Sequence, residues 1–150
     1  LSTPGSPAKL RVVGKGEFED AWSQRGNEVY LGFKPLPEVI EQMRRSLYMV
    51  VPSIWFENCP RTSVEAFSVG LPVIASRIGA LAELIEDGVT GLLVEPHDPR
   101  DLANKMAWAE AHPDAMLAMG RQAHARYRAC YAPDVNLAEL LAIYRGVQAR

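Results

Sequence analysis

Residues 47–70 read LYMVVPSIWFENCPRTSVEAFSVG, and this stretch decides the fold class. It begins with an apolar segment, Leu47–Val51, that has the length and β-branched content of a buried strand. A loop follows and leads into Arg61–Val69, which we expect to be a helix with Pro60 at its first position. A buried strand that leads through a loop into a helix indicates a parallel α/β sheet.

Short apolar runs alternate with amphipathic stretches on both sides of this segment, as in a sheet covered by helices. The expected strands are Leu10–Val13, Val29–Leu31, Leu47–Val51, Val73–Ala75 and Leu92–Val94. The expected helices lie near Glu17–Gln24, Pro37–Ser46, Arg61–Val69 and Ala80–Ile85. From Asp98 onward the pattern is helical only, with apolar positions spaced for a buried face: Leu102, Met106, Ala109, Leu117, Met119, Ala123, Leu137, Leu140, Leu141 and Tyr144. We predict an α/β, Rossmann-like domain with one open parallel sheet, closed by a helical C-terminal tail.

The composition fits one globular domain, since 150 residues that are 48% hydrophobic can bury a substantial core. The 16 Lys and Arg against 18 Asp and Glu show no long run of one sign, which argues against nucleic acid or an anionic membrane as the main partner. Cys59 and Cys130 are far apart in sequence, so we expect no disulfide, no zinc site and a cytoplasmic location. No apolar run approaches the roughly 20 residues that cross a bilayer, and Leu1–Gly5 does not resemble a signal peptide.

The loop of residues 52–60 lies where an open α/β sheet binds ligands, beyond the carboxyl ends of its strands. With Pro60 at the first helical position, Arg61, Thr62 and Ser63 would present free N–H groups. Such a helix start attracts anions, phosphates especially. A cation in the first turn, such as Arg61, interacts unfavourably with the helix dipole and destabilises the helix by about 0.3–1 kcal/mol, unless a bound anion offsets its charge. The pattern therefore predicts an anion site.

Two glutamates bracket this predicted anion site. Glu65 lies about four residues, or roughly 6 Å, inside the helix, and its carboxylate could accept hydrogen bonds from both hydroxyls of a ribose attached to the phosphate. Glu57 precedes the helix, where it could accept from sugar hydroxyls or balance positive charge at an anomeric carbon. The alternative is that Glu65 merely pairs with Arg61 at i,i+4 and that Glu57 is solvated, because exposed pairs of this kind are common.

A longer set of positions resembles glycosyltransferase family 4, the retaining enzymes of GT-B fold. These positions are Pro52-Ser53, Glu57 to Glu65, Ala66, Gly70, Pro72 to Ser76, Gly79, Glu83, Asp87-Gly88, Thr90 to Val94 and Pro96. Residues Leu10–Glu17 and Val29–Phe33 also resemble the nucleotide-binding half of that family. Paired glutamates eight positions apart, as in Glu57 and Glu65, are characteristic of it.

The resemblance implies a role for each site residue. It implies that Glu57 contacts the donor sugar and is the catalytic residue. It also implies that Glu65 binds the ribose. The remaining substrate-binding positions that it implies are Gly32, Phe33 and Lys34 for the base, and Asn58, Cys59, Pro60, Arg61 and Thr62 for sugar and phosphate. The implied reaction transfers a hexose from a UDP- or GDP-sugar to a saccharide or lipid-linked acceptor with retention of configuration. We expect no metal and no cofactor besides the donor, because the helix dipole and basic residues can neutralise a diphosphate.

The chain departs from the family pattern in two places. Pro60 stands where many members have glycine and removes one backbone donor, although an Asn-x-Pro form also occurs in the family. Nothing before Leu10 resembles the opening strand–helix unit, with its Gly-Arg and Lys-Gly pairs, and the acceptor-binding N-terminal half has no counterpart. We therefore expect this chain to be a fragment of a two-domain enzyme and to be inactive on its own. For the complete enzyme, peripheral association with a membrane is compatible with this expectation.

Alternative interpretations remain for several features. The chain could be a non-catalytic nucleotide-sugar-binding or assembly module. A dinucleotide-binding domain is disfavoured, because Glu19 stands at the third glycine position of G-x-G-x-x-G. Lys34 could reach the nucleotide or be solvated. Tryptophans are expected to pack in the core or at its edge, with a wall of the sugar pocket as the second interpretation for Trp55.

Overall fold

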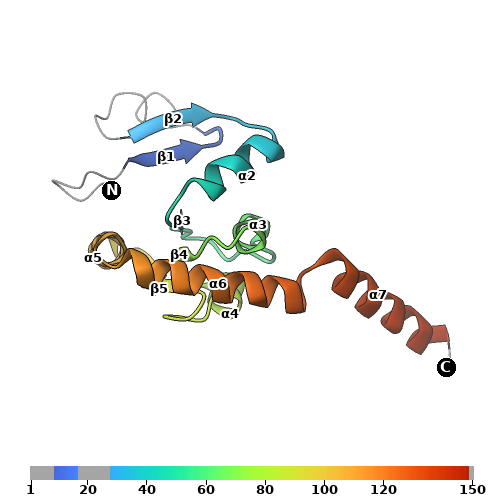
Figure 1. Cartoon of the computed structure of the whole chain (residues 1–150). Coiled ribbons are helices and arrows are strands. Elements are labelled where there is room, and N and C mark those ends of the chain that lie inside the picture. Colours follow the sequence, from blue (N-terminus) through green and yellow to red (C-terminus); the bar gives the residue numbers. More distant parts are fainter. Residues whose placement is uncertain (1–8, 17–27, 149–150) are drawn as a thin grey trace.

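The computed structural model describes residues 9–16 and 28–148, which form short parallel strands flanked by helices (Figure 1). The strands are β1 (Leu10–Val13), β2 (Glu28–Gly32), β3 (Met49–Val51), β4 (Val73–Ser76) and β5 (Gly91–Val94). The helices are α2 (Leu36–Arg44), α3 (Arg61–Ser68), α4 (Gly79–Leu84), α5 (Pro99–Ala111), α6 (Pro113–Cys130) and α7 (Pro133–Gln148). The α/β class and all five predicted strands are confirmed. The helix expected near Glu17–Gln24 lies outside the described residues.

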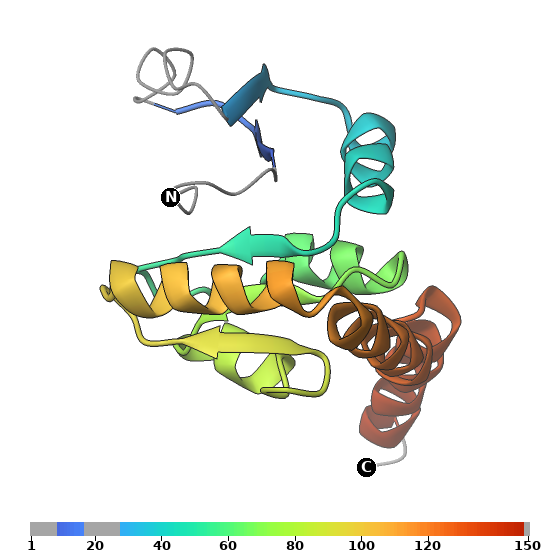
Figure 2. The same ribbon diagram turned by 60° about the vertical axis from the view of Figure 1, so that its left-hand side comes forward.

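The strands form two parallel sheets instead of the one open sheet that we predicted. One sheet pairs β1 with β2, and the other has the order β3-β4-β5. Both views show the β1–β2 sheet set apart from β3–β5 and joined to them through α2 (Figures 1 and 2). A doubly wound sheet has the strand order 3-2-1-4-5-6, numbered along the chain, with strand 1 at its centre. The group β1–β2 corresponds to the strands on one side of that central strand, and the group β3–β5 to the strands on the other side. Within the described ranges no strand pairs with the free edge of β1 or β3, which explains why the sheet divides there.

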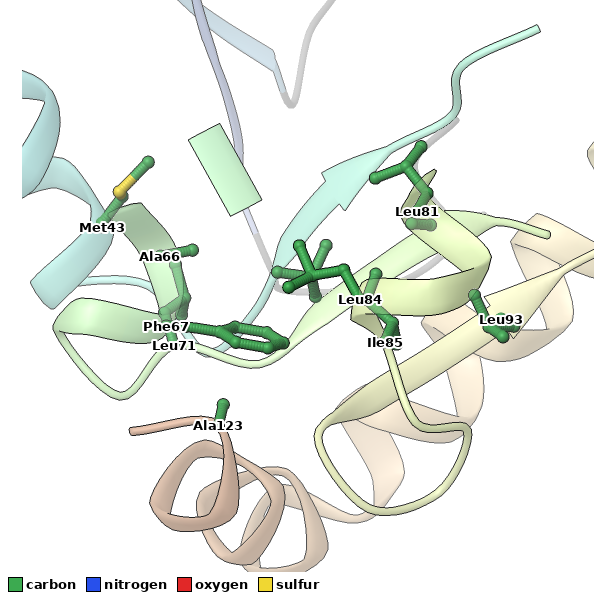
Figure 3. Close-up of a cluster of buried hydrophobic side chains, with 11 residues drawn as sticks. Met43, Ala66, Phe67, Leu71, Leu81, Leu84, Ile85, Leu93 and Ala123 are labelled. Carbon is green, nitrogen blue, oxygen red and sulfur yellow. The ribbon is translucent and has the colours of Figure 1, made fainter. Parts of the chain in front are cut away.

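The three-stranded sheet is covered by helices on both faces, because successive side chains of its strands point to opposite sides. Val73 and Ala75 of β4 pack into one cluster with Phe67 of α3, and the other buried members from α2, α4, β5 and α6 surround them (Figure 3). Ile74, between them, packs into a second cluster with Leu102, Met106 and Ala109 of α5. The predicted buried face of α5 is therefore confirmed, and the sheet is fixed from both sides.

The C-terminal helices depart from the prediction of a tail that closes the domain. In α6, Met119 and Ala123 are buried as expected, whereas Leu117 is exposed. Helix α7 extends away from the body of the molecule (Figure 1). Its large apolar side chains other than Val135 are exposed, namely Leu137, Leu140, Leu141, Ile143, Tyr144 and Val147. Their helical spacing correctly indicates a helix, but no element of the described residues covers them.

Candidate functional site

The candidate site is the loop from Pro52 to Pro60, which joins the carboxyl end of β3 to α3. A second loop, at the carboxyl end of the neighbouring strand β4, holds it in place. The N–H of Ala80 donates to the carbonyl of Glu57 at 3.3 Å. Gly79 has a φ of 51°, and a Cβ there would lie 3.2 Å from Cδ1 of Phe56, so glycine suits this close approach. The two loops therefore form one surface at the carboxyl edge of the sheet.

The carboxylate of Glu57 is fixed by a hydrogen bond from within its own loop. The Ser53 hydroxyl donates to Oε1 of Glu57 at 2.9 Å, and the Glu57 residue is half-buried. One oxygen of the carboxylate is thereby oriented and the other has no protein donor among the described residues. Sequence reasoning gave Ser53 no role, although its position four residues before Glu57 and within the family pattern was a usable signal.

The start of α3 differs from the prediction by one residue. Pro60 is the N-cap, in front of a helix that begins at Arg61, and the Pro60 side chain is buried. Two of the three N–H groups that we expected to be free are bonded locally. The Arg61 N–H donates to the Cys59 carbonyl at 2.8 Å, and the Ser63 N–H donates to the Pro60 carbonyl at 2.9 Å. The backbone dihedrals of Pro60, φ −77° and ψ 70°, permit this tight turn.

Thr62 is the residue that keeps an available N–H at this helix start. No hydrogen bond from its amide is present within the described ranges. The positive end of the α3 dipole is therefore presented through this amide. Beside it in the same turn, the Ser63 hydroxyl is fully buried and has no hydrogen-bond partner among the described residues, an arrangement that costs about 1–3 kcal/mol.

Glu65 and Arg61 form the i,i+4 pair of the alternative interpretation, but the pair is weak. Their charged atoms lie 3.7 Å apart, and the Arg61 side chain is 81% exposed against 24% for Glu65. Exposed pairs of this kind contribute about 0–1 kcal/mol. The guanidinium therefore remains available to an anion, and Glu65 lies one helical turn behind it.

The predicted base-binding segment, Gly32, Phe33 and Lys34, begins at the last residue of β2, in the other sheet. Gly32 adopts a φ of 67°, Phe33 is exposed, and Lys15 lies 5.9 Å from the centre of the Phe33 ring. Lys34 is paired with Glu38 of α2 at 3.4 Å, and both side chains are partly exposed. Among the described residues, no hydrogen bond joins this segment to the loop of Glu57. Its role in base binding stays a prediction.

Arg77, which follows β4, is occupied by neighbouring carboxylates. It donates to Asp87 at 2.9 Å and lies 3.3 Å from Glu95. The hydrogen bond to Asp87 raises the pKa of Arg77 further above its usual value. Burial raises the pKa of Asp87, but the Leu93 N–H and the Arg77 guanidinium outweigh it and hold that pKa below its usual value. Arg77 therefore serves the turn before β5 instead of an anion.

The remaining side chains give no sign of a metal centre. In the part of the chain that the structure describes, no group of three or more His, Cys, Asp or Glu residues is placed to hold a metal ion. Cys59 and Cys130 are both free and exposed. The helices of the described ranges include none long and apolar enough to span a bilayer.

The site lies within a stretch that matches a known protein family. The model of this family, described as glycosyl transferases group 1, matches residues 2–126. The chain belongs to this family. The D-inositol 3-phosphate glycosyltransferase of Corynebacterium kroppenstedtii is 32% identical over 122 residues, which cover 79% of the chain and 27% of that relative. An uncharacterised glycosyltransferase of Methanocaldococcus jannaschii is 42% identical over 76 residues, which cover 51% of the chain and 21% of that relative.

Solved structures show that this family member has the fold of glycosyltransferases. Sucrose-phosphate synthase from Thermosynechococcus elongatus matches 94% of the chain with a TM-score of 0.84 at 24% identity, and the match covers 39% of that protein. The Anabaena protein HepE in complex with UDP-glucose matches 89% of the chain with a TM-score of 0.76 at 24% identity, and the match covers 40% of it. The chain therefore spans well under half the length of these four proteins.

Proposed function

We propose that this chain forms the donor side of a retaining glycosyltransferase of family 4. The enzyme would transfer a hexose from a UDP- or GDP-sugar to a saccharide or lipid-linked acceptor. The observation that carries the proposal is the grouping of Glu57, the available Thr62 amide, Arg61 and Glu65 along one loop and helix start at the carboxyl edge of the sheet. The complexes of HepE with UDP-glucose and with UDP support a nucleotide sugar as the ligand class.

Each group in the site has a chemical role in this proposal. The Thr62 N–H and the exposed Arg61 guanidinium would bind the diphosphate, which supplies the anion that offsets a cation in the first turn of α3. Glu65, one turn further along, would accept hydrogen bonds from the ribose hydroxyls. Glu57 would accept from the sugar hydroxyls and stabilise the positive charge that develops at the anomeric carbon. The Arg61 N–H would reach the ligand only after release of its bond to the Cys59 carbonyl.

The proposal needs no metal ion and no cofactor besides the donor. A guanidinium, a free amide and the positive end of a helix dipole together offer positive potential at the place where the diphosphate would lie. In a site shielded from water, such fixed groups also stabilise the negative charge that builds up on the departing nucleotide.

The complete enzyme would require polypeptide beyond these 150 residues. We propose that it supplies an acceptor-binding domain and the central strand between β1 and β3, with the Gly-Arg and Lys-Gly pairs that hold the diphosphate in the family. The strand order around the free edges of β1 and β3 supports this part of the proposal. The enzyme would act in the cytoplasm, with acceptor binding and peripheral membrane association as properties of the other domain.

Glu65→Ala is expected to weaken UDP or GDP binding about tenfold or more. The reason is the loss of hydrogen bonds between a charged acceptor and the ribose hydroxyls, each of which contributes about 1.5–3 kcal/mol. Isothermal titration of the purified chain with UDP and with GDP measures the effect. Glu139→Ala, which removes an exposed glutamate of α7, is the matched control and should leave the affinity unchanged. Equal nucleotide affinity in the Glu65 variant and the unmodified chain would refute the ribose assignment.

A further inference from the structure

Trp55 is the largest side chain of the site loop, and it is not packed. It is 74% exposed, whereas the expectation was a core or edge position. Trp108, by comparison, stacks on His112 with ring centres 4.4 Å apart. No ring or cation partner of Trp55 is present among the described residues. An exposed indole on an ordered loop is a typical feature of a ligand-binding surface.

The loop brings Trp55 and the Glu57 carboxylate close together through one hydroxyl. Oγ of Ser53 lies 2.9 Å from Oε1 of Glu57 and 3.4 Å from the carbonyl oxygen of Trp55. Two residues of chain separate the Cα atoms of Trp55 and Glu57 by at most about 7 Å. The indole and the carboxylate that faces the donor in our proposal therefore belong to the same short segment of the loop.

The neighbouring aromatic residue, Phe56, is also exposed, at 81%. One edge of its ring lies near the start of α4, where a Cβ placed on Gly79 would lie 3.2 Å from its Cδ1. The hydrogen bond from the Ala80 N–H to the Glu57 carbonyl joins the loop to the start of α4. Trp55 is thus an exposed ring on a loop that is held by the Ser53 hydroxyl before it and by the Glu57 carbonyl after it.

We propose that Trp55 is a stacking platform for the hexose ring of the donor, a specificity-determining residue that adds to Glu57. A pyranose has hydroxyls around its rim and apolar C–H groups on its faces, so a carboxylate and an indole recognise complementary parts of it. A small number of polar groups beside an aromatic surface is the usual composition of a small-ligand site. This inference rests on the proposed function and extends it from the nucleotide to the sugar.

The test compares the affinity for a nucleotide with that for the corresponding nucleotide sugar, using UDP with UDP-glucose and GDP with GDP-mannose. We expect Trp55→Ala to weaken binding of the sugar-linked ligand about three- to tenfold and to leave binding of the free nucleotide unchanged. Trp55→Phe, which keeps an aromatic ring, should recover most of the lost affinity. Trp108→Ala is the matched tryptophan control and should change neither affinity.

The possible results of this titration separate the inference from the proposed function. If Trp55→Ala lowers neither affinity, or lowers both by the same factor, Trp55 does not recognise the sugar and the inference is overturned, while the nucleotide site stands. If the unmodified chain binds neither UDP nor GDP, the proposed function itself fails and this inference fails with it. Because the side chain is exposed, the variants should keep the thermal stability of the unmodified chain, which a melting curve verifies.

Discussion

Glu57→Gln in the complete enzyme is expected to slow sugar transfer by a factor of about 10² to 10³, the usual effect of removing one preorganised electrostatic group. The substitution keeps the size of the side chain and its hydrogen bond from Ser53, but removes the negative charge. That charge is what we propose stabilises the anomeric carbon as it becomes positive. Steady-state rates with a UDP- or GDP-hexose donor measure the change in kcat and in KM separately.

Nucleotide binding distinguishes this effect from general damage to the loop. UDP or GDP affinity should be retained in the Glu57 variant, because the free nucleotide carries no sugar for Glu57 to contact. Glu139→Gln, on the exposed face of α7, provides the control for loss of one acidic charge. A Glu57 variant with an unchanged transfer rate would show that the carboxylate takes no part in the reaction.

Phe67→Ala is expected to lower the free energy of unfolding by about 3–5 kcal/mol. Phe67 is fully buried at the centre of the first core cluster, where its ring points from α3 toward Leu84 and Ile85 (Figure 3). Removing the ring leaves a cavity between α3 and α4 that the surrounding helices can fill only in part. Since the total stability of a domain is about 5–15 kcal/mol, this loss is a large share of it. Urea unfolding followed by circular dichroism measures the change.

Leu117→Ala is the comparison that tests the burial argument. Leu117 lies on α6 with most of its side chain in water, so the same kind of truncation there should change stability by no more than about 0.5 kcal/mol. Equal destabilisation by the two substitutions would contradict the core described above. The Phe67 variant should also bind nucleotide only where it is folded, because α3 carries both the core ring and the site.

The sequence was most informative where one physical effect dominates. The strands around Val73 and Leu92 are apolar throughout because both faces of the sheet are covered, and such runs can be recognised without a structure. The buried positions of α5, led by Leu102, follow from helical spacing alone. The position of the candidate loop at the carboxyl end of β3 follows from the strand and helix order alone.

The sequence was less informative where the outcome depends on partners far away in the chain. The free edges of β1 and β3 divide the predicted sheet in two, and no local pattern reveals which strand lies beside another. The apolar positions of α7 have the spacing of a buried face but remain exposed, because burial requires a neighbour.

Inside the site, local geometry and not composition decided which groups are available. Pro60 could occupy either the N-cap or the first helical position, and this choice of one residue determines whether the Arg61 amide is free or bonded to Cys59. The general tendency of large aromatic residues predicts that Trp55 packs, but its side chain is exposed on the loop of the candidate site.

The central claim is that the start of α3 and its two flanking glutamates form a nucleotide-diphosphate site. Its most direct test is titration of the ¹⁵N-labelled chain with UDP and with GDP, followed through the assigned backbone amide signals. The account predicts saturable shifts that are largest within residues 57–65, led by the Thr62 amide, and absent with uridine, which lacks the diphosphate. Saturable shifts confined to another part of the chain, or no shifts at millimolar nucleotide, would contradict it.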